Sequence, residues 1–441
     1  MKSESQHQIR ERLSHGLLAL RDRTFSMTQA LTDDDIHGQF DPLMSPLVWD
    51  MGHIANFEEY WLLRELGGRK AHDPERDEMY NPFDNPRWIR GDLPLLDRHE
   101  AKEYLTEVRH DVDTELLRTD LRDGPEIARG GYVFEMTMQH EAQHQETMLQ
   151  ALNVRPDLAP YDLATTRRLP SRRSVEDTER IRISAGPFMM GTDDRISAYD
   201  NERPSHAVHV DAFDIDRFPV TNRRFAAFVD DAGYELPELW SAEGWAWRTG
   251  VDHQAPQGWI RDGQGGWTQL MFGLIRSLDP SEPVIHISFW EAEAFAAYEG
   301  GRLPTEEEWE KAASADPDSA SVSIYPWGDT PPTNRHANLG QHGWGPAPVG
   351  SYALGASVYG VEQLLGDVYE WTASRFLPYP GYTTFPYPEY SEVFFEDSNF
   401  RVLRGASWAT APSVARNSFR NWDYRQRRQI LAGVRLAWDV S

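Results

Sequence analysis

The stretch that decides the fold of the N-terminal part is residues 130–153, which read GGYVFEMTMQHEAQHQETMLQALN. The apolar side chains that recur along it at helical spacing are Phe134, Met138, Met148 and Leu152. This period predicts an amphipathic helix over about 130–153. Its middle is polar, and it places His140 and His144 four residues apart, on one helix face and about 6 Å from each other. Two imidazoles so placed suit one metal ion, although a solvated polar face has the same pattern.

Working outward from this helix, three earlier segments share its periodicity. They are residues 8–31, a segment from Ser45–Pro46 to Gly67–Gly68, and residues 97–119. We expect Ser45 to be an N-cap and Pro46 to be the first helical residue. Residues 69–94 are rich in Pro, Arg and Asp and are predicted to form a long loop. Four long amphipathic helices predict a four-helix bundle over residues 1–155.

The composition and the pattern of predicted elements change after a linker that we place at residues 156–178. Short strands are predicted at Arg180–Ile183 and His206–Val210, between loops rich in Gly, Pro and Trp. Capping boxes predict the starts of two further helices, at Ser288–Glu291 and at Thr305–Glu308. We therefore predict an α+β chain, with a second domain over residues 179–441 that is rich in irregular structure.

Charge and composition argue against several kinds of partner and exclude several kinds of site. The 441 residues include 44 basic and 70 acidic side chains, a formal net charge of −26, which argues against nucleic acid and anionic lipid as partners. Cysteine is absent, which excludes disulfides, thiolate metal sites and a cysteine nucleophile. The sequence shows neither an apolar run of about 18 residues nor a signal peptide, so the expected location is cytoplasmic, without a membrane contact or an obligate protein partner.

A third metal ligand is expected at His53, inside the apolar stretch from Leu47 to Trp61 on another helix of the bundle. A core histidine that binds no metal is the alternative reading of this position. Carboxylates at Asp50, Glu141 and Glu146 remain competing ligands.

The segment His140–His144 also fits the H-E-x-x-H motif of zinc proteases, with Glu141 as the base. The longer form of that motif needs Gly and His where this chain has Thr147 and Gln150. The other subclass needs a helical Glu about twenty residues later, where the linker is predicted. The protease remains an alternative function.

Three neutral imidazoles on ferrous iron leave open positions and a full positive charge, which favours an anionic ligand such as a thiolate. Arginines stand among aromatic residues in the segments 86–90 and 420–428. Guanidinium groups bind carboxylates in a bidentate manner, so these segments suggest a carboxylate pocket, with surface ion pairs as the alternative.

Seven blocks of the C-terminal part resemble the formylglycine-generating (sulfatase-modifying factor) fold, a C-type-lectin-like domain. They are GPFMMG at 186–191, FPVTN at 218–222, GRLPTEEEWE at 301–310, YPWG at 325–328, GDVYEW at 366–371, LRGASW at 403–408 and GVRL at 433–436. The cysteines that generate formylglycine cannot be present, so that activity is excluded.

The N-terminal part resembles the DinB-like bundle. With PLMSPLVWD at 42–50 leading to His53, nearly the whole chain is similar to the ergothioneine-pathway sulfoxide synthases, or hercynine oxygenases. The resemblance implies Fe(II) on His53, His140 and His144. It also implies an O2-dependent bond between the thiol of γ-glutamylcysteine, or of cysteine, and the imidazole C2 of hercynine.

The same resemblance implies roles for single residues. Those expected to hold γ-glutamylcysteine are Arg87, Arg90, Asp423 and Arg427. Those expected around hercynine are Gln143, Asn421 and Trp422, where the indole suits a trimethylammonium group. The family also uses a tyrosine beside iron, for which we select Tyr382 and keep Tyr379 and Tyr387 as alternatives.

Two further functions stay open beside the protease. One is an ovothiol-type synthase, which forms the bond on histidine itself. The other is a non-catalytic lectin-like binding module.

Overall fold

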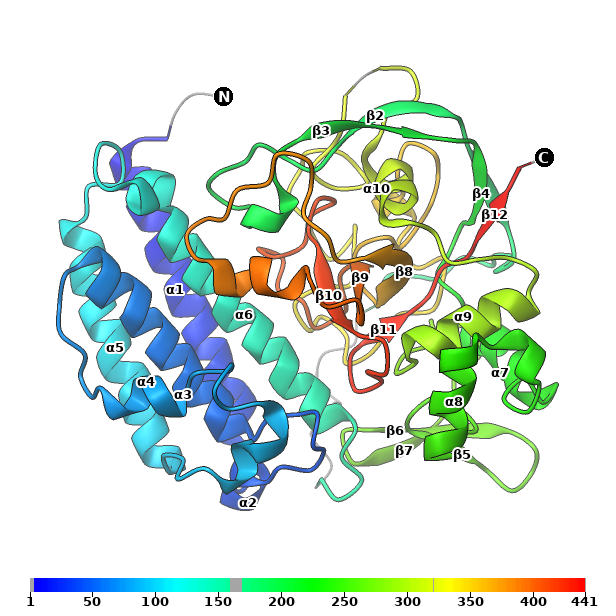
Figure 1. Cartoon of the computed structure of the whole chain (residues 1–441), viewed down its shortest axis with the longest axis horizontal. Helices are drawn as coiled ribbons and strands as arrows, with labels where there is room; N and C mark the ends of the chain where they lie inside the picture. The colour runs from blue at the N-terminus through cyan, green and yellow to red at the C-terminus, as the bar shows by residue number, and fades with distance from the viewer. Residues whose placement is uncertain (1–3, 159–168, 320, 441) are drawn as a thin grey trace. The chain divides into compact units, whose positions relative to one another are not determined.

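A computed structural model describes residues 4–158, 169–319 and 321–440. The chain divides into two compact units (Figure 1). The first comprises residues 1–161 and 194–197, and the second comprises residues 162–193 and 198–441. The expected linker, 156–178, falls partly on residues 159–168, which lie outside the described residues.

The first unit is helical. Its elements are α1 (Gln6–Gln29), α2 (Asp33–His37), α3 (Leu47–Glu58), a π-helical continuation (Glu59–Leu66), α4 (Glu75–Met79), a 3-10 turn (Arg87–Asp92), α5 (Arg98–Arg118), a second 3-10 turn (Glu126–Gly131) and α6 (Tyr132–Asn153). The four long helices α1, α3, α5 and α6 pack side by side as a bundle (Figure 1). This agrees with the four helices expected from the sequence, and α6 is buried along most of its length.

Helix α6 begins at two glycines that no other residue type would replace easily. Gly130 and Gly131 have φ of 66° and 90°, a left-handed backbone that favours glycine. A Cβ on Gly131 would lie 2.8 Å from Leu13 Cδ1 of α1. The glycine pair therefore allows α6 to start in contact with α1.

The interior of the bundle contains a four-residue ion network formed by Arg21, Glu58, Arg109 and Glu141. Their side chains are between 2% and 10% exposed. Arg21 Nε donates to Glu141 Oε1 at 3.0 Å, and Arg109 Nη2 donates to Glu141 Oε2 at 2.8 Å. Two cations and two carboxylates thus neutralise each other inside the first unit.

Two expectations for this unit are wrong in detail. Helix α3 starts at Leu47 with Pro46 at the cap position, and no side chain caps it. The hydroxyl of Ser45 instead accepts a hydrogen bond from Arg90 Nη1 at 2.8 Å, so it is not available to the helix. Residues 69–94 are not all loop, because they contain α4 and the 3-10 turn Arg87–Asp92.

The second unit combines short strands and helices with long irregular connections. Its strands are β1 (Arg180–Ile183), β2 (Gly186–Met190), β3 (His206–Val210), β4 (Phe213–Asp216), β5 (Trp259–Arg261), β6 (Trp267–Met271), β7 (Leu274–Ser277), β8 (Tyr369–Arg375), β9 (Phe400–Gly405), β10 (Asn421–Tyr424), β11 (Ala432–Gly433) and β12 (Ala437–Asp439). Its helices are α7 (Asn222–Asp230), α8 (Ala242–Val251), α9 (Phe289–Tyr298) and α10 (Glu306–Ser314). Both expected strands are present, and the expected capping boxes start α9 and α10.

The strands form four small sheets, with the orders β1-β4-β12, β10-β9-β8-β11, β2-β3 and β5-β6-β7. In the largest sheet β8 pairs antiparallel with β9 and parallel with β11. The apolar core of the unit surrounds Trp309 of α10 and includes residues of β1 to β4. None of the helices in the described ranges is long and apolar enough to cross a membrane.

Charged residues from the seven sequence blocks that resemble the formylglycine-generating fold form buried ion pairs in this unit. Arg435 pairs with Glu370 at 2.8 Å, and both side chains are fully buried. Arg404 pairs in the same way with Glu310 at 2.5 Å, and Trp309 Nε1 donates to Glu370 Oε2 at 2.7 Å. These blocks therefore stabilise the fold of the second unit.

Candidate metal centre

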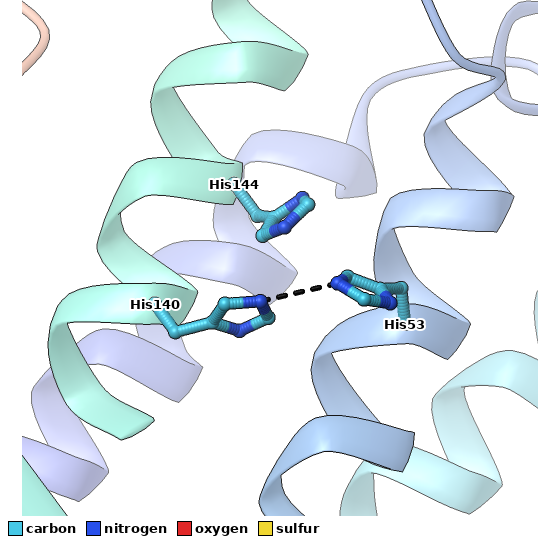
Figure 2. A group of neighbouring side chains, drawn as sticks. All are labelled: His53, His140 and His144. Carbon is cyan, nitrogen blue, oxygen red and sulfur yellow. Dashed lines mark hydrogen bonds between the residues drawn. The ribbon is translucent and has the colours of Figure 1, made fainter. Parts of the chain in front are cut away.

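Three histidines from two helices converge inside the first unit (Figure 2). We call His53, His140 and His144 the histidine centre. His53 comes from α3, and the other two lie one turn apart on α6. One ligand nitrogen from each lies within 4.8 Å of the others, and the Nε2 atoms of His53 and His140 are 3.1 Å apart. This is the grouping that the sequence suggested.

Hydrogen bonds at the far side of two rings fix which nitrogen faces inward. His53 Nδ1 lies 2.8 Å from the backbone carbonyl oxygen of Tyr80, so it carries the proton and donates. His144 Nδ1 lies 2.8 Å from Asp50 Oδ1, which accepts in the same way. Each ring then turns an unprotonated Nε2 toward the centre, as metal-binding imidazoles do.

Burial keeps the rings of His53 and His140 neutral. Desolvation, with the charge of His144 second, lowers the pKa of His53 well below its usual range. The pKa of His140 falls for the same two reasons. Neutral imidazoles offer a lone pair, and two nitrogens on one ion at about 2.1 Å would stand about 3.0–3.4 Å apart. The donor set therefore fits one divalent transition metal.

Aromatic rings support the histidines. Trp49 stacks on His53 with ring centroids 4.7 Å apart, and Phe57 stacks on His140 at 3.8 Å. The guanidinium of Arg90 lies 3.5 Å above the Trp49 ring. Trp49 and Phe57 stand four residues before and after His53, so helical spacing is the signal that could have singled them out.

The acidic residues that competed as ligands have other positions. Asp50 contacts the Nδ1 side of His144, and in the described part of the chain the group able to hold a metal consists of the three histidines alone. Glu141 is bound by Arg21, Arg109 and Thr24 in the ion network. A carboxylate held by these partners is not a free base, which argues against the protease mechanism. Glu146 is buried on the same helix.

Three expected substrate residues belong to the first unit. Arg87 is half-buried, and among the described residues its Nε has no hydrogen-bond partner. Arg90 is buried and donates to Ser45 Oγ and to the carbonyl oxygen of Asn85, each at 2.8 Å. Gln143 lies one residue before His144 on α6 and is partly exposed.

Four others belong to the second unit, where Asn421, Trp422 and Asp423 follow one another on β10. Phe376 covers one face of the Trp422 indole at 4.0 Å. Arg427 is 1% exposed and lies 3.8 Å from the Asp423 carboxylate. An indole, a carboxylate and a guanidinium are thus grouped within a few residues.

The three tyrosine candidates differ in their surroundings. The Tyr382 hydroxyl donates to Asp200 Oδ2 at 2.8 Å, and the ring is partly exposed. Tyr379 is buried against the Arg420 guanidinium, which lies 4.2 Å from its ring, and desolvation raises its pKa well above the usual range. Tyr387 packs edge-on against Tyr390. Asp200, the partner of Tyr382, is not among the residues predicted from the sequence.

A helical bundle that gathers three imidazoles able to hold a metal ion, in one chain with an irregular α+β domain, defines a two-domain protein with a candidate metal centre. The DinB superfamily matches residues 17–148, and the Sulfatase-modifying factor enzyme 1-like domain matches residues 166–440. Over 261 residues, 53% of this chain and 75% of the relative, the chain is 32% identical to the inactive Cα-formylglycine-generating enzyme 2 of Mus musculus.

Relatives of the same length carry the comparison further. The chain is 46% identical over 439 residues to a hercynine oxygenase of Mycolicibacterium smegmatis, covering 98% of this chain and 99% of that protein. It is 46% identical over 434 residues to a hercynine oxygenase of Mycobacterium tuberculosis, with 98% and 99% covered. The chain therefore belongs to the hercynine oxygenase family, the sulfoxide synthases of ergothioneine biosynthesis.

Proposed function

We propose that this enzyme uses Fe(II) and O2 to join the thiol of γ-glutamylcysteine to the imidazole C2 of hercynine. In the balanced reaction one thiol, one imidazole C–H and one O2 give one sulfoxide and one water. Forming the C–S bond and oxidising the sulfur each release two electrons, and together these reduce O2. The observation that carries the proposal is the histidine centre, in a chain that matches hercynine oxygenases along 98% of its length.

His53, His140 and His144 would hold the iron, which supplies open positions for a thiolate and for O2. Three neutral ligands leave the positive charge of the ion uncompensated, so an anionic sulfur binds better than a neutral one. The protein contributes a rigid setting, because Trp49 and Phe57 stack on two of the rings.

Arg87 is the residue that we propose for a carboxylate of the thiol substrate, because its Nε is unpaired among the described residues. Arg90 is proposed for the same substrate, with a smaller share, since two of its nitrogens and its stacking face are engaged within the protein. Asp423 and Arg427 offer complementary charges for the ammonium and carboxylate groups of γ-glutamylcysteine.

For hercynine we propose the partly exposed indole of Trp422 as the partner of the trimethylammonium group, with Asn421 and Gln143 as hydrogen-bonding groups. Tyr382 is proposed as the proton donor of the reaction. The contact of its hydroxyl with Asp200 means that the phenol must exchange this partner during turnover.

The test is O2 uptake by protein loaded anaerobically with Fe(II) and supplied with hercynine and γ-glutamylcysteine. We expect uptake and a sulfoxide product, identified by mass spectrometry, and no reaction when either substrate is omitted. Product formed with histidine but not with hercynine would indicate the ovothiol-type synthase. No uptake with any imidazole would indicate a binding module, and peptide cleavage with Zn(II) would indicate the protease. Replacing γ-glutamylcysteine by cysteine decides the thiol donor.

A further inference from the structure

Asp50 is a buried carboxylate that contacts the Nδ1 side of a ring in the histidine centre. It stands one turn before His53 on α3, and it is 1% exposed. Its Oδ1 accepts from His144 Nδ1 at 2.8 Å. The contact joins α3 to α6 and orients a ring on the opposite helix.

Among the described residues, the Asp50 carboxylate has few other polar partners. Its second oxygen, Oδ2, is buried and has no hydrogen-bond partner in the described ranges. Arg90 is a cation whose charge interacts with this carboxylate: burial and the charge of Arg87 lower the pKa of Arg90 to about 9, and Asp50 acts in the opposite direction. A buried carboxylate with a single neutral donor is costly unless a positive charge lies close to it. A metal ion on the other nitrogen of the same ring would supply that charge.

The three rings are held in different ways. His53 donates to a neutral carbonyl oxygen, and His140 packs flat against Phe57. Of the three rings, His144 is the one whose described contacts include a carboxylate. A carboxylate partner makes an imidazole a more basic ligand and fixes its tautomer, and losing such a partner usually lowers metal affinity 10- to 100-fold.

We propose that Asp50 is a positioning residue that fixes His144 and supplies negative charge to the metal centre. The inference rests on the proposed function, since it needs a metal at the histidine centre. It assigns Asp50 a role that is distinct from direct ligation, and it makes His144 the strongest donor of the three.

The first experiment compares metal affinity in wild type, Asp50→Asn and Asp50→Ala, measured with Co(II) or Zn(II) in competition with a chelator. Asparagine keeps the size and one acceptor oxygen but removes the charge, so we expect affinity to fall about 10- to 100-fold, with a larger loss in Asp50→Ala. The visible bands of the Co(II) protein should shift in both variants. The matched control is Asp77→Asn, which removes a charge that pairs with Arg64 elsewhere in the same unit and should leave affinity unchanged.

The second experiment needs no variant. In metal-free wild-type protein with 15N-labelled histidine, the His144 ring should be the tautomer with a proton on Nδ1. The opposite tautomer, or an Asp50→Asn protein with wild-type affinity and an unshifted Co(II) spectrum, would overturn the role of Asp50 and leave the proposed function intact. A wild-type protein that binds no metal would refute the proposed function and this inference with it.

Discussion

The ion network behind the histidine centre makes a sharp prediction for Glu141→Gln. Glutamine has nearly the same shape as glutamate, so the change removes a charge and one acceptor without opening a cavity. In the protein, Arg21, Arg109 and Thr24 all donate to this carboxylate, the last at 2.7 Å. The amide NH2 of glutamine would face at least one of these donors with its own hydrogens.

The magnitude follows from burial, because the Glu141 side chain is only 2% exposed and water cannot replace the lost interaction. Removing one partner of a buried ion pair costs about 3–5 kcal/mol. Since the variant keeps one acceptor oxygen and the arginines keep Glu58, we expect about 3 kcal/mol, the lower end of that range. For a domain of about 150–250 residues this is a fall of about 6–12 °C in the Tm of the helical unit.

The assay is thermal and urea unfolding followed by circular dichroism at a helix wavelength, with metal affinity measured below the transition. The matched control is Glu103→Gln on α5, where the side chain is 61% exposed and the expected change lies within about 0.5 kcal/mol. Glu141→Gln should still bind metal when folded. An unchanged unfolding transition would refute the reasoning. Loss of Zn(II)-dependent peptide cleavage at unchanged stability would instead assign Glu141 the role of a base.

Four other predictions concern the centre, the substrates and pH. His53→Ala should lose tight metal binding, which metal analysis after dialysis measures, and full retention of metal would show that a carboxylate takes its place. Arg87→Ala should lower kcat/KM for γ-glutamylcysteine about 30- to 1000-fold and affect cysteine less, whereas equal losses would assign the arginine to the fold. Tyr382→Phe should keep its metal and a near-normal KM but divert the thiol to sulfinic acid, as mass spectrometry of the products would reveal; unchanged partitioning would exclude this tyrosine. Burial raises the pKa of Asp216 to about 6, and Arg224 partly opposes that rise, so the free energy of unfolding should fall by about 2 kcal/mol as pH rises from 4 to 7; urea unfolding of Asp216→Asn should show a smaller dependence of this free energy on pH.

The helices of the bundle could be predicted because their signals are local. Apolar residues repeat at helical spacing, and the capping boxes of α9 and α10 each lie within four residues. The start of α3 was misplaced by one residue for a reason that is not local. Ser45 has the chemistry of an N-cap, but Arg90, forty-five residues later, takes its hydroxyl. Competition between partners distant in sequence has no signature in a window of a few residues.

Part of the histidine centre could also be predicted from the sequence, because part of its signal is local. The pair on α6 follows from helical geometry, and His53 stood out as a polar residue in an apolar stretch. The partner of His53 is the backbone carbonyl of Tyr80, which any residue could have supplied, so no side-chain pattern indicates it. Asp50 was visible as a carboxylate near the centre, but only the structure separates a ligand from a residue that holds a ligand.

Charge balance links these features to the chemistry. Arg21 and Arg109 cancel Glu58 and Glu141, so the network behind α6 contributes no net charge to the centre. Asp50 faces the centre through His144, while Arg90 lies above Trp49 and opposes that carboxylate. With three neutral imidazoles, the protein therefore leaves most of the charge of a divalent ion uncompensated. In a buried site of low dielectric such a charge attracts anionic ligands strongly. A thiolate is the form of the sulfur substrate that satisfies this requirement, which is why a three-histidine centre suits the formation of a C–S bond.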